Sequence, residues 1–339
     1  MPRLPEIKQF LSSGGIRIYR IPCKVLAELT GRVYLVLEAG PPTLVDTGSG
    51  QGDSTKNILD GFETVRRDFG ESIRIEDVQR ILITHAHPDH CGGLPDLLQR
   101  ARAEVAIHPL DSRSITANAE CVALVRHGIG RLLDQIGVPG TLGEDLLRRH
   151  WQLPEAFPAI DVNTELLERN AFDGFRVLHT PGHSPGHVCL LADDLLLCGD
   201  HVLSRTIPQL WPESLRPYKG LAHYLESLQT VRAVRGIRMA LPGHETVIDD
   251  VYKRIDDIDR SERRRIQYVV DVLDQADRPL TIWEISRTIY QQTAGFYASL
   301  ALMDTAARVE YLHQRGRLRL ANLEQIESDP RAAWQYQTK

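Results

Sequence analysis

Short apolar stretches in the first fifty residues predict a set of β-strands. They are rich in β-branched and aromatic residues and are separated by glycine and proline: GIRIYRIP (15–22), RVYLVLEAG (32–40) and PTLVDTG (42–48). Residues 54–69 instead place apolar side chains at helical spacing, and Asp53 or Ser54 is a candidate N-cap. A strand (79–84), a helix (94–101) and another strand (103–109) follow. This alternation predicts an α/β layered fold.

Residues 111–170 have a different pattern, which we interpret as a helical insertion. The segments 117–137 and 142–153 are both expected to be helical, and glycine and proline occupy the loops between and after them. Strands resume at 175–182 and at 187–200, where residues 192–194 predict a hairpin turn. A helix at 220–235 then leads into the strand IRMALPGHE (237–245).

The pattern changes again after about residue 254. Three helices are predicted there, at 261–276, 281–290 and 299–316, followed by a short strand at 316–322. We therefore expect a larger domain at 1–254 and a small winged-helix-like domain at 255–339.

Composition and charge narrow the class of protein. The 339 residues are 42% hydrophobic and 25% charged, with a formal net charge of −5, so the whole chain gives no sign of a polyanionic partner. The N-terminus lacks the apolar segment of a signal peptide, and no stretch reaches the roughly 18 apolar residues of a membrane span. The five cysteines are scattered and odd in number, which predicts free thiols in a reducing compartment. We expect a cytoplasmic protein without membrane association.

The segment HAHPDH (85–90) is the strongest chemical signal, because three histidines and an aspartate follow a strand within six positions. Crowded imidazoles beside a carboxylate need a cation, and these donors suit zinc, iron or manganese. Such a cluster leaves part of a coordination shell to other segments. Single candidates lie just beyond later predicted strands: His183 in TPGHSPGH, Asp200 in LLLCGDH and His244 in LPGHE.

HAHPDH is identical in pattern to the HxHxDH signature of the metallo-β-lactamase superfamily, and the GHS, GDH and PGHE segments follow in that family's order. The chain resembles this superfamily over residues of about 16–250. The resemblance implies an αββα sandwich as the catalytic domain and two divalent ions, with zinc favoured and iron or manganese as alternatives. It implies that His85, His87 and His183 hold one ion and that Asp89, His90 and His244 hold the other, with Asp200 bridging them. The glyoxalase II and acyl-homoserine lactonase branches are the most similar, because all seven positions match.

Further residues receive lesser roles. Asp46 in LVDTG matches a family position and is expected to orient a ligand. His201 is a candidate proton donor facing the substrate, whereas His187 is expected to be structural. The remaining histidines are expected on the surface or in the core: His108, His127, His150, His179, His223 and His313. The GHSPG segment matches the GxSxG pattern of serine hydrolases, but Pro185 lacks the N–H of an oxyanion hole and a strand follows.

The expected activity is hydrolysis. Two ions would activate a bridging hydroxide, which Asp89 would orient toward a small-molecule thioester, ester or lactone. The insertion is expected to cover the metal face, and Trp211 and Tyr218 are candidate pocket residues. One alternative is a metal-dependent ribonuclease or phosphodiesterase; it is less favoured because residues 255–339 hold 12 basic and 13 acidic residues. Another is a persulfide dioxygenase with one iron. In a small-molecule hydrolase, the C-terminal domain is expected to pack on the sandwich or to mediate formation of a homodimer.

Overall fold

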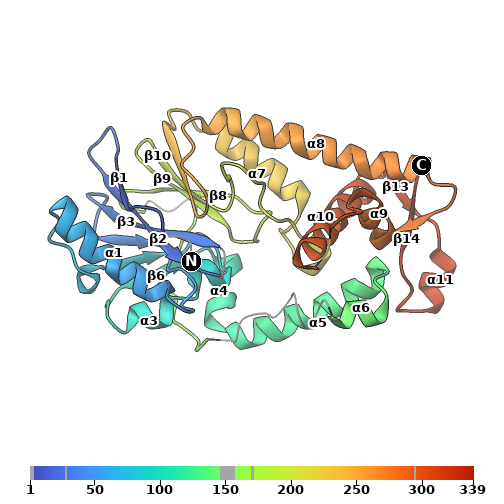
Figure 1. Ribbon diagram of the computed structural model, residues 1–339, viewed down its shortest axis with the longest axis horizontal. Helices are drawn as coiled ribbons and strands as arrows, with labels where there is room; N and C mark the ends of the chain where they lie inside the picture. The colour runs from blue at the N-terminus through green and yellow to red at the C-terminus, as the bar shows by residue number, and fades with distance from the viewer. Residues whose placement is uncertain (1–3, 27–28, 146–156, 169–171, 294) are drawn as a thin grey trace. The chain divides into compact units, whose positions relative to one another are not determined.

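The first sheet has seven strands, and the predicted strands of the N-terminal region form its first half. The computed structural model describes residues 4–26, 29–145, 157–168, 172–293 and 295–339 (Figure 1). The strands lie in chain order: β1 (Lys8–Leu11), β2 (Arg17–Lys24), β3 (Thr30–Leu37), β4 (Thr43–Val45), β5 (Arg80–Leu82), β6 (Glu104–Ile107) and β7 (Thr164–Glu165). Pairing is antiparallel from β1 to β4 and parallel from β4 to β7. The short outer strands β1 and β7 were not predicted, since neither has a distinct apolar run.

The second sheet has four strands in the order β11-β10-β9-β8. Its members are β8 (Arg176–His179), β9 (Val188–Ala192), β10 (Leu195–Gly199) and β11 (Met239–Pro242). The predicted hairpin turn is confirmed, because β9 pairs antiparallel with β10 and Asp193 takes a left-handed backbone conformation with φ of 54°. Strand β11 adds to β10 in parallel, so the ends of both strands open toward the same edge.

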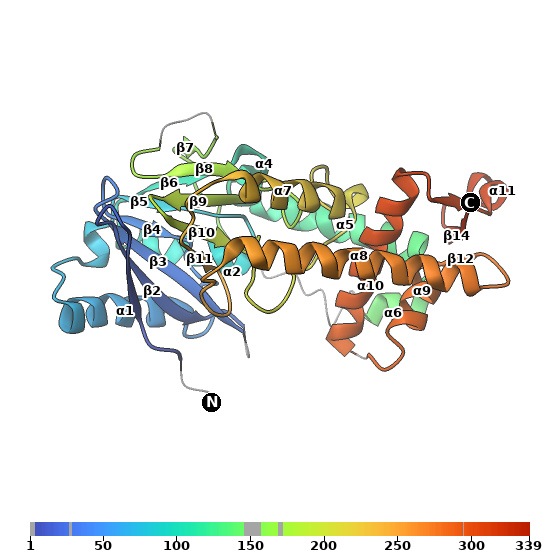
Figure 2. The same ribbon diagram turned by 90° about the horizontal axis from the view of Figure 1, so that it is seen from above.

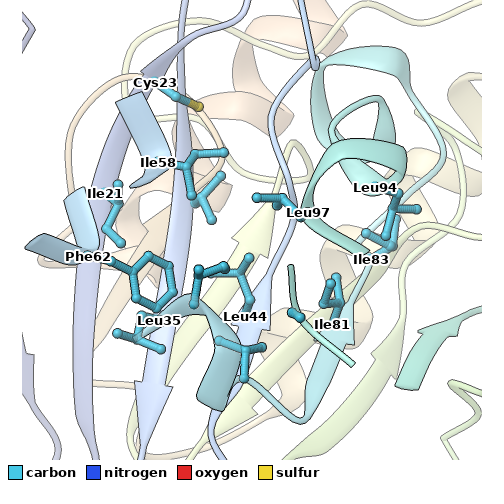
Figure 3. Packing of buried hydrophobic residues seen from close by; sticks show 14 of the residues in the cluster. Ile21, Cys23, Leu35, Leu44, Ile58, Phe62, Ile81, Ile83, Leu94 and Leu97 are labelled. Atoms are coloured by element: carbon cyan, nitrogen blue, oxygen red, sulfur yellow. The ribbon is translucent and has the colours of Figure 1, made fainter. Parts of the chain in front are cut away.

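Alternation along β2 and β3 creates two separate cores. Tyr19, Ile21 and Leu35 face one side, where helix α1 (Ser54–Phe69) contributes Ile58 and Phe62 (Figure 3). Ile18, Tyr34 and Val36 face the other side and join residues of the second sheet in one cluster. Burial of a side chain such as Phe62 contributes about 2–3 kcal/mol. Successive residues of a strand point to opposite faces of the sheet. One apolar face of the first sheet therefore packs on helices, and the other packs on the second sheet.

Helices complete the outer layers. Besides α1, the first sheet is flanked by α3 (Leu94–Leu98) and α4 (Pro109–Thr116), and Leu94, Leu97 and Ile115 belong to the same core cluster as Ile58. Helix α7 (Leu221–Ala233) lies beside the second sheet (Figure 2), and Ser227 Oγ donates to the carbonyl of Pro181 just after β8 (2.7 Å). The predicted α/β sandwich of helix, sheet, sheet and helix is confirmed.

The helical insertion is described in part. Helix α5 (Asn118–Ile136) confirms the predicted helix at 117–137, and α6 (Gly140–Asp145) begins the segment predicted as a helix at 142–153. The rest of that segment, which includes His150, lies outside the described residues. Helix α4 was not predicted; Pro109 occupies its first turn, where proline is tolerated.

The chain divides into two compact units, each made of several segments. Unit 1 contains residues 1–119, 156–208 and 226–255, and unit 2 contains 120–155, 209–225 and 256–339. The continuous helix α8 (Val251–Gln275) begins ten residues earlier than the helix predicted from Ser261, and it spans the predicted boundary at 254/255. The domain limits 1–254 and 255–339 stay a prediction.

Unit 2 has a small sheet of its own. Its C-terminal elements are α8 from Asp256 onward, β12 (Leu280–Thr281), α9 (Ile282–Ile289), α10 (Gly295–Gln314), β13 (Leu318–Leu320), α11 (Leu323–Ser328) and β14 (Gln335–Thr338). The strands form an antiparallel sheet in the order β12-β14-β13. Thr281 and Glu284 form a capping box at the start of α9. The winged-helix-like character of this region stays a prediction. Among the described helices, none combines the length and apolar character needed to cross a bilayer.

Candidate metal centre

The loop after β5 presents the HAHPDH segment at the edge of the first sheet. Backbone at His87 is extended, and Pro88 then starts the short helix α2 (Pro88–Cys91). His85 and His87 therefore lie on the extended part, while Asp89 and His90 lie on the helical turn. This change of conformation allows four donors close in sequence to approach one region from different directions.

The first group of donors brings His85 and His87 together with His183. One nitrogen from each of these three side chains lies within 4.8 Å of the other two. His85 Nε2 is 3.0 Å from His87 Nδ1, and the rings of His87 and His183 are 4.4 Å apart between centroids. His183 comes from the loop between β8 and β9, so the group joins both sheets.

The second group joins Asp89 and His90 to His244, and its ligand atoms also lie within 4.8 Å of one another. His244 Nε2 is 3.2 Å from Asp89 Oδ2 and 3.3 Å from His90 Nε2. Asp200, at the end of β10, lies beside both groups. Its carboxylate oxygens are 3.5 Å from His90 Nε2, 3.5 Å from His244 Nε2 and 3.7 Å from His183 Nε2.

The side chains present fit divalent cations. Asp200 Oδ1 is buried and accepts no hydrogen bond from the described residues. Imidazole nitrogens that approach to 3.0 and 3.3 Å need a proton or a cation between them. Five imidazoles and two carboxylates are a donor set that suits zinc, manganese or iron. All seven predicted ligand positions are thus brought together.

Electrostatics favour a cation at the same place. Burial would raise the pKa of the Asp200 carboxyl, but the nearby His244 and His90 hold it well below its usual range. Burial would lower the pKa of His90, yet the carboxylates of Asp200, Asp46 and Asp89 raise it well above its usual value. His90 therefore attracts a proton that a bound metal ion would replace.

Asp46 supports this arrangement from the end of β4. Its carboxylate is 2.8 Å from His90 Nδ1 and accepts from the backbone N–H of Thr84 (2.8 Å). The backbone of Asp46 is in the left-handed region with φ of 63°, which costs free energy that the surrounding bonds offset. An Asp46 contact of this kind leaves Nε2 of His90 directed toward the cluster, as expected for a residue that orients a ligand.

Two other candidate ligands, Asp200 and His244, are also held by hydrogen bonds. His187 Nε2 accepts from the backbone N–H of Asp200 (3.1 Å), and its Nδ1 is 2.8 Å from Thr180 Oγ1. His244 Nδ1 donates to the carbonyl of Thr30 (3.0 Å). His187 thus holds a ligand in place and belongs to none of the donor groups found among the described residues.

Asp111 was missed by the sequence analysis. It is 1% exposed, and its carboxylate accepts from the backbone N–H of Ala86 (3.1 Å), the hydroxyl of Ser184 (2.7 Å) and the backbone N–H of Gly186 (3.0 Å). It therefore ties the HAHPDH loop to the loop of His183. No motif surrounds Asp111, and only the packing of α4 brings it to this position.

Other predicted residues have different environments. His201 is fully buried, and burial lowers its pKa to about 3, which speaks against a proton donor open to substrate. Ser184 donates to Asp111, and the strand expected after this segment is confirmed as β9, where a serine hydrolase elbow would need a helix. Trp211 and Tyr218 belong to unit 2, and their place in a pocket stays a prediction.

Comparisons with known proteins agree with this geometry. The family model of the metallo-beta-lactamase superfamily matches residues 27–259, so the chain belongs to this superfamily, and the predicted class of enzyme, a hydrolase, is confirmed. A crystal structure of a metallo-beta-lactamase family protein from Thermus thermophilus is 26% identical with a TM-score of 0.70, covering 95% of this chain and 98% of that one.

Two curated relatives extend the comparison. The lactamase-like protein aptB of Emericella nidulans is 25% identical over 79% of this chain and 73% of its own length. A hydroxyacylglutathione hydrolase of Xylella fastidiosa is 30% identical over 50% of this chain and 48% of its own length. This chain therefore aligns with about half of that hydrolase.

Proposed function

We propose that this protein is a dinuclear metal-dependent hydrolase of small-molecule thioesters, esters or lactones. The observation that supports it most directly is the convergence of His85, His87 and His183 beside Asp89, His90 and His244, with Asp200 between the two groups. The first three would hold one ion, the second three the other, and Asp200 both. When bound, a pair of divalent ions supplies a hydroxide nucleophile near neutral pH and polarises a carbonyl group.

Asp89 is the residue that we propose to act on the reacting atoms. It is the one partly exposed carboxylate of the cluster, whereas Asp200 is buried. Burial would raise the pKa of Asp89, but His90 and His244 hold it far below its usual range. An ionised carboxylate that is partly exposed can accept a hydrogen bond from the nucleophile and so orient it.

The substrate class rests on two arguments. The Xylella fastidiosa relative is named for the hydrolysis of a glutathione thioester, which supports acyl transfer to water over phosphodiester cleavage. Residues 255–339 are close to neutral overall, which does not favour a nucleic acid. A second group of donors at Asp89, His90 and His244 supports two ions over the single iron of a dioxygenase.

Metal quantification and a substrate panel test the proposal. We expect two divalent ions per chain and hydrolysis of an acyl-glutathione, an acyl-CoA or a lactone, with no cleavage of RNA or of a phosphodiester. His87→Ala should lose metal and turnover with an unchanged circular dichroism spectrum, whereas His127→Ala, at an exposed histidine of α5, should keep both. One iron with oxygen uptake, or full turnover in His87→Ala, would refute the proposal.

A further inference from the structure

Two arginines of the first sheet are buried without a carboxylate partner. Arg20 and Arg32 are 6% and 7% exposed. Among the described residues, Arg20 Nε is buried without an acceptor, and the guanidinium lies over the ring of Phe10 at 5.9 Å. Arg32 donates to the carbonyls of Gly31 (3.1 Å) and Glu245 (3.3 Å), and its Nε is buried without an acceptor. A buried cation without a counter-ion is costly.

The strand register places both side chains on the same face. Arg20 pairs with Tyr34 on β3 and with Lys8 on β1, while Arg32 pairs with Pro22. Arg20 and Arg32 are therefore diagonal neighbours, with backbones about 7–8 Å apart, within reach of long side chains. Ile18 and Tyr34 belong to the core between the sheets, so this is the inner face of the first sheet.

The charges on this face reinforce one another. Lys8, Arg20 and Arg32 place three cations on neighbouring strands, and Lys8 is exposed at the outer strand β1. Burial lowers the pKa of the Arg32 guanidinium, and the charge of Arg20 lowers it further. Like charges on adjacent strands destabilise a sheet. An anion between the guanidinium groups would reduce the repulsion and accept from the Nε–H groups, which are buried without an acceptor.

We propose that Arg20 and Arg32, with Lys8 at the outer edge, form a binding site for a phosphate group. Two planar guanidinium groups match the oxygens of a phosphate in bidentate fashion, and its double negative charge compensates both. The site is separate from the seven metal donors but adjoins the last of them. The backbone N–H of Arg32 donates to Gly243 (2.8 Å), and its Nη2 donates to Glu245, the two neighbours of His244.

Calorimetric titration of the metal-loaded protein with inorganic phosphate tests this site. Arg20→Met and Arg32→Met should each weaken the binding of one phosphate by roughly tenfold or more, because each removes hydrogen bonds to a charged group. Arg102→Met, which removes an exposed arginine of the same unit, is the matched control and should bind as the wild type does. Arg20→Lys keeps the charge and should retain part of the affinity, which also covers a failure of Arg20→Met to fold.

Further titrations distinguish phosphate binding at this site from binding at the metal centre, and they identify the form of phosphate that binds. Phosphate bound at the metal ions is lost in His87→Ala and kept in Arg20→Met, whereas the proposed site shows the opposite pattern. Phenyl phosphate in place of phosphate distinguishes an esterified group from the free ion, and acetate should bind more weakly than either. Without phosphate, Arg20→Met should be at least as heat-stable as the wild type, since it removes an uncompensated charge. Equal phosphate binding in the wild type and Arg20→Met, or an equal loss in Arg102→Met, would overturn the proposal.

Discussion

Buried charged and polar groups occur in both units, but their partners differ. In unit 2 a buried arginine contacts a buried glutamate, whereas in unit 1 buried histidine nitrogens face one another. In unit 2, Arg308 and Glu262 are 2% and 0% exposed at their side chains and form two hydrogen bonds of 2.8 Å. In unit 1, histidine nitrogens of the metal centre approach other histidine nitrogens, and Asp200 Oδ1 has no hydrogen-bond donor among the described residues. The Arg308–Glu262 pair places opposite charges in contact, although Arg308 Nε has no acceptor among the described residues. The clustered imidazole nitrogens instead need a proton or a cation between them.

Removing the shared carboxylate should have the largest effect. Asp200→Asn keeps the size of the side chain but removes the negative charge that lies beside both donor groups. We expect loss of bound metal and a fall in kcat of about 10³-fold or more, because in the proposed function the ions would supply the nucleophile. Metal content by mass spectrometry of the native protein and turnover of the best thioester measure this. Normal metal content would show that Asp200 is not a ligand.

Breaking the Arg308–Glu262 pair should affect stability and leave the metal centre intact. Arg308→Met removes the cation that donates two hydrogen bonds to Glu262 and leaves this buried carboxylate with Arg265 at 3.5 Å, so the free energy of unfolding should fall by about 3–5 kcal/mol. Urea denaturation followed by circular dichroism measures the loss. The double variant Arg308→Met/Glu262→Leu should regain most of it, and both variants should bind metal as the wild type does. A double variant as unstable as the single one would contradict the explanation.

Loss of the carboxylate that joins two ligand loops should have an intermediate effect. Asp111→Ala removes three hydrogen bonds to Ala86, Ser184 and Gly186, so the metal affinity should fall by about 10–100-fold. Competition with a chelating dye measures this affinity. Asp111→Asn keeps an acceptor and should lose less, while Asp60→Ala on the exposed face of α1 is a control. If Asp111→Ala bound metal as tightly as the control, the joining role would be wrong.

The smallest effect is expected at a paired charge near the surface. The hydrogen bond from Arg238 lowers the pKa of Asp194 to about 2, and Ser13 contributes. Since the folded pKa lies below the unfolded value of about 4, this pair stabilises above pH 4 and loses its contribution between about pH 4 and 2. Asp194→Asn should therefore be about 1 kcal/mol less stable at pH 6, and this gap should narrow toward pH 2.

Unfolding curves at several pH values test that expectation. Asp249→Asn, at an exposed aspartate of the same unit, serves as the reference. A gap between the wild type and Asp194→Asn that stays constant from pH 6 to pH 2 would exclude the ion pair as its cause.

Much of the fold was predictable because local pattern and tertiary structure agree. The helix at 54–69 matches α1 residue for residue, and the strands of GIRIYRIP and RVYLVLEAG match β2 and β3, since each segment has a clear period of 3.6 or 2. Strand β7 could not be found, because two residues carry no period. Helix α8 began earlier than predicted since its first turns also pack in unit 1, where Val251 and Ile255 are buried.

The sequence by itself predicted which residues are candidate metal donors, because histidine and aspartate beyond strand ends reveal their chemistry through residue type and order. Tertiary structure alone decided what supports those donors and where charge remains uncompensated. Asp111 approaches Ser184 across 73 positions, and Arg20 is isolated from acids only once three strands pair. Both depend on contacts between distant segments, and the free energy of such contacts comes from packing rather than from any local pattern.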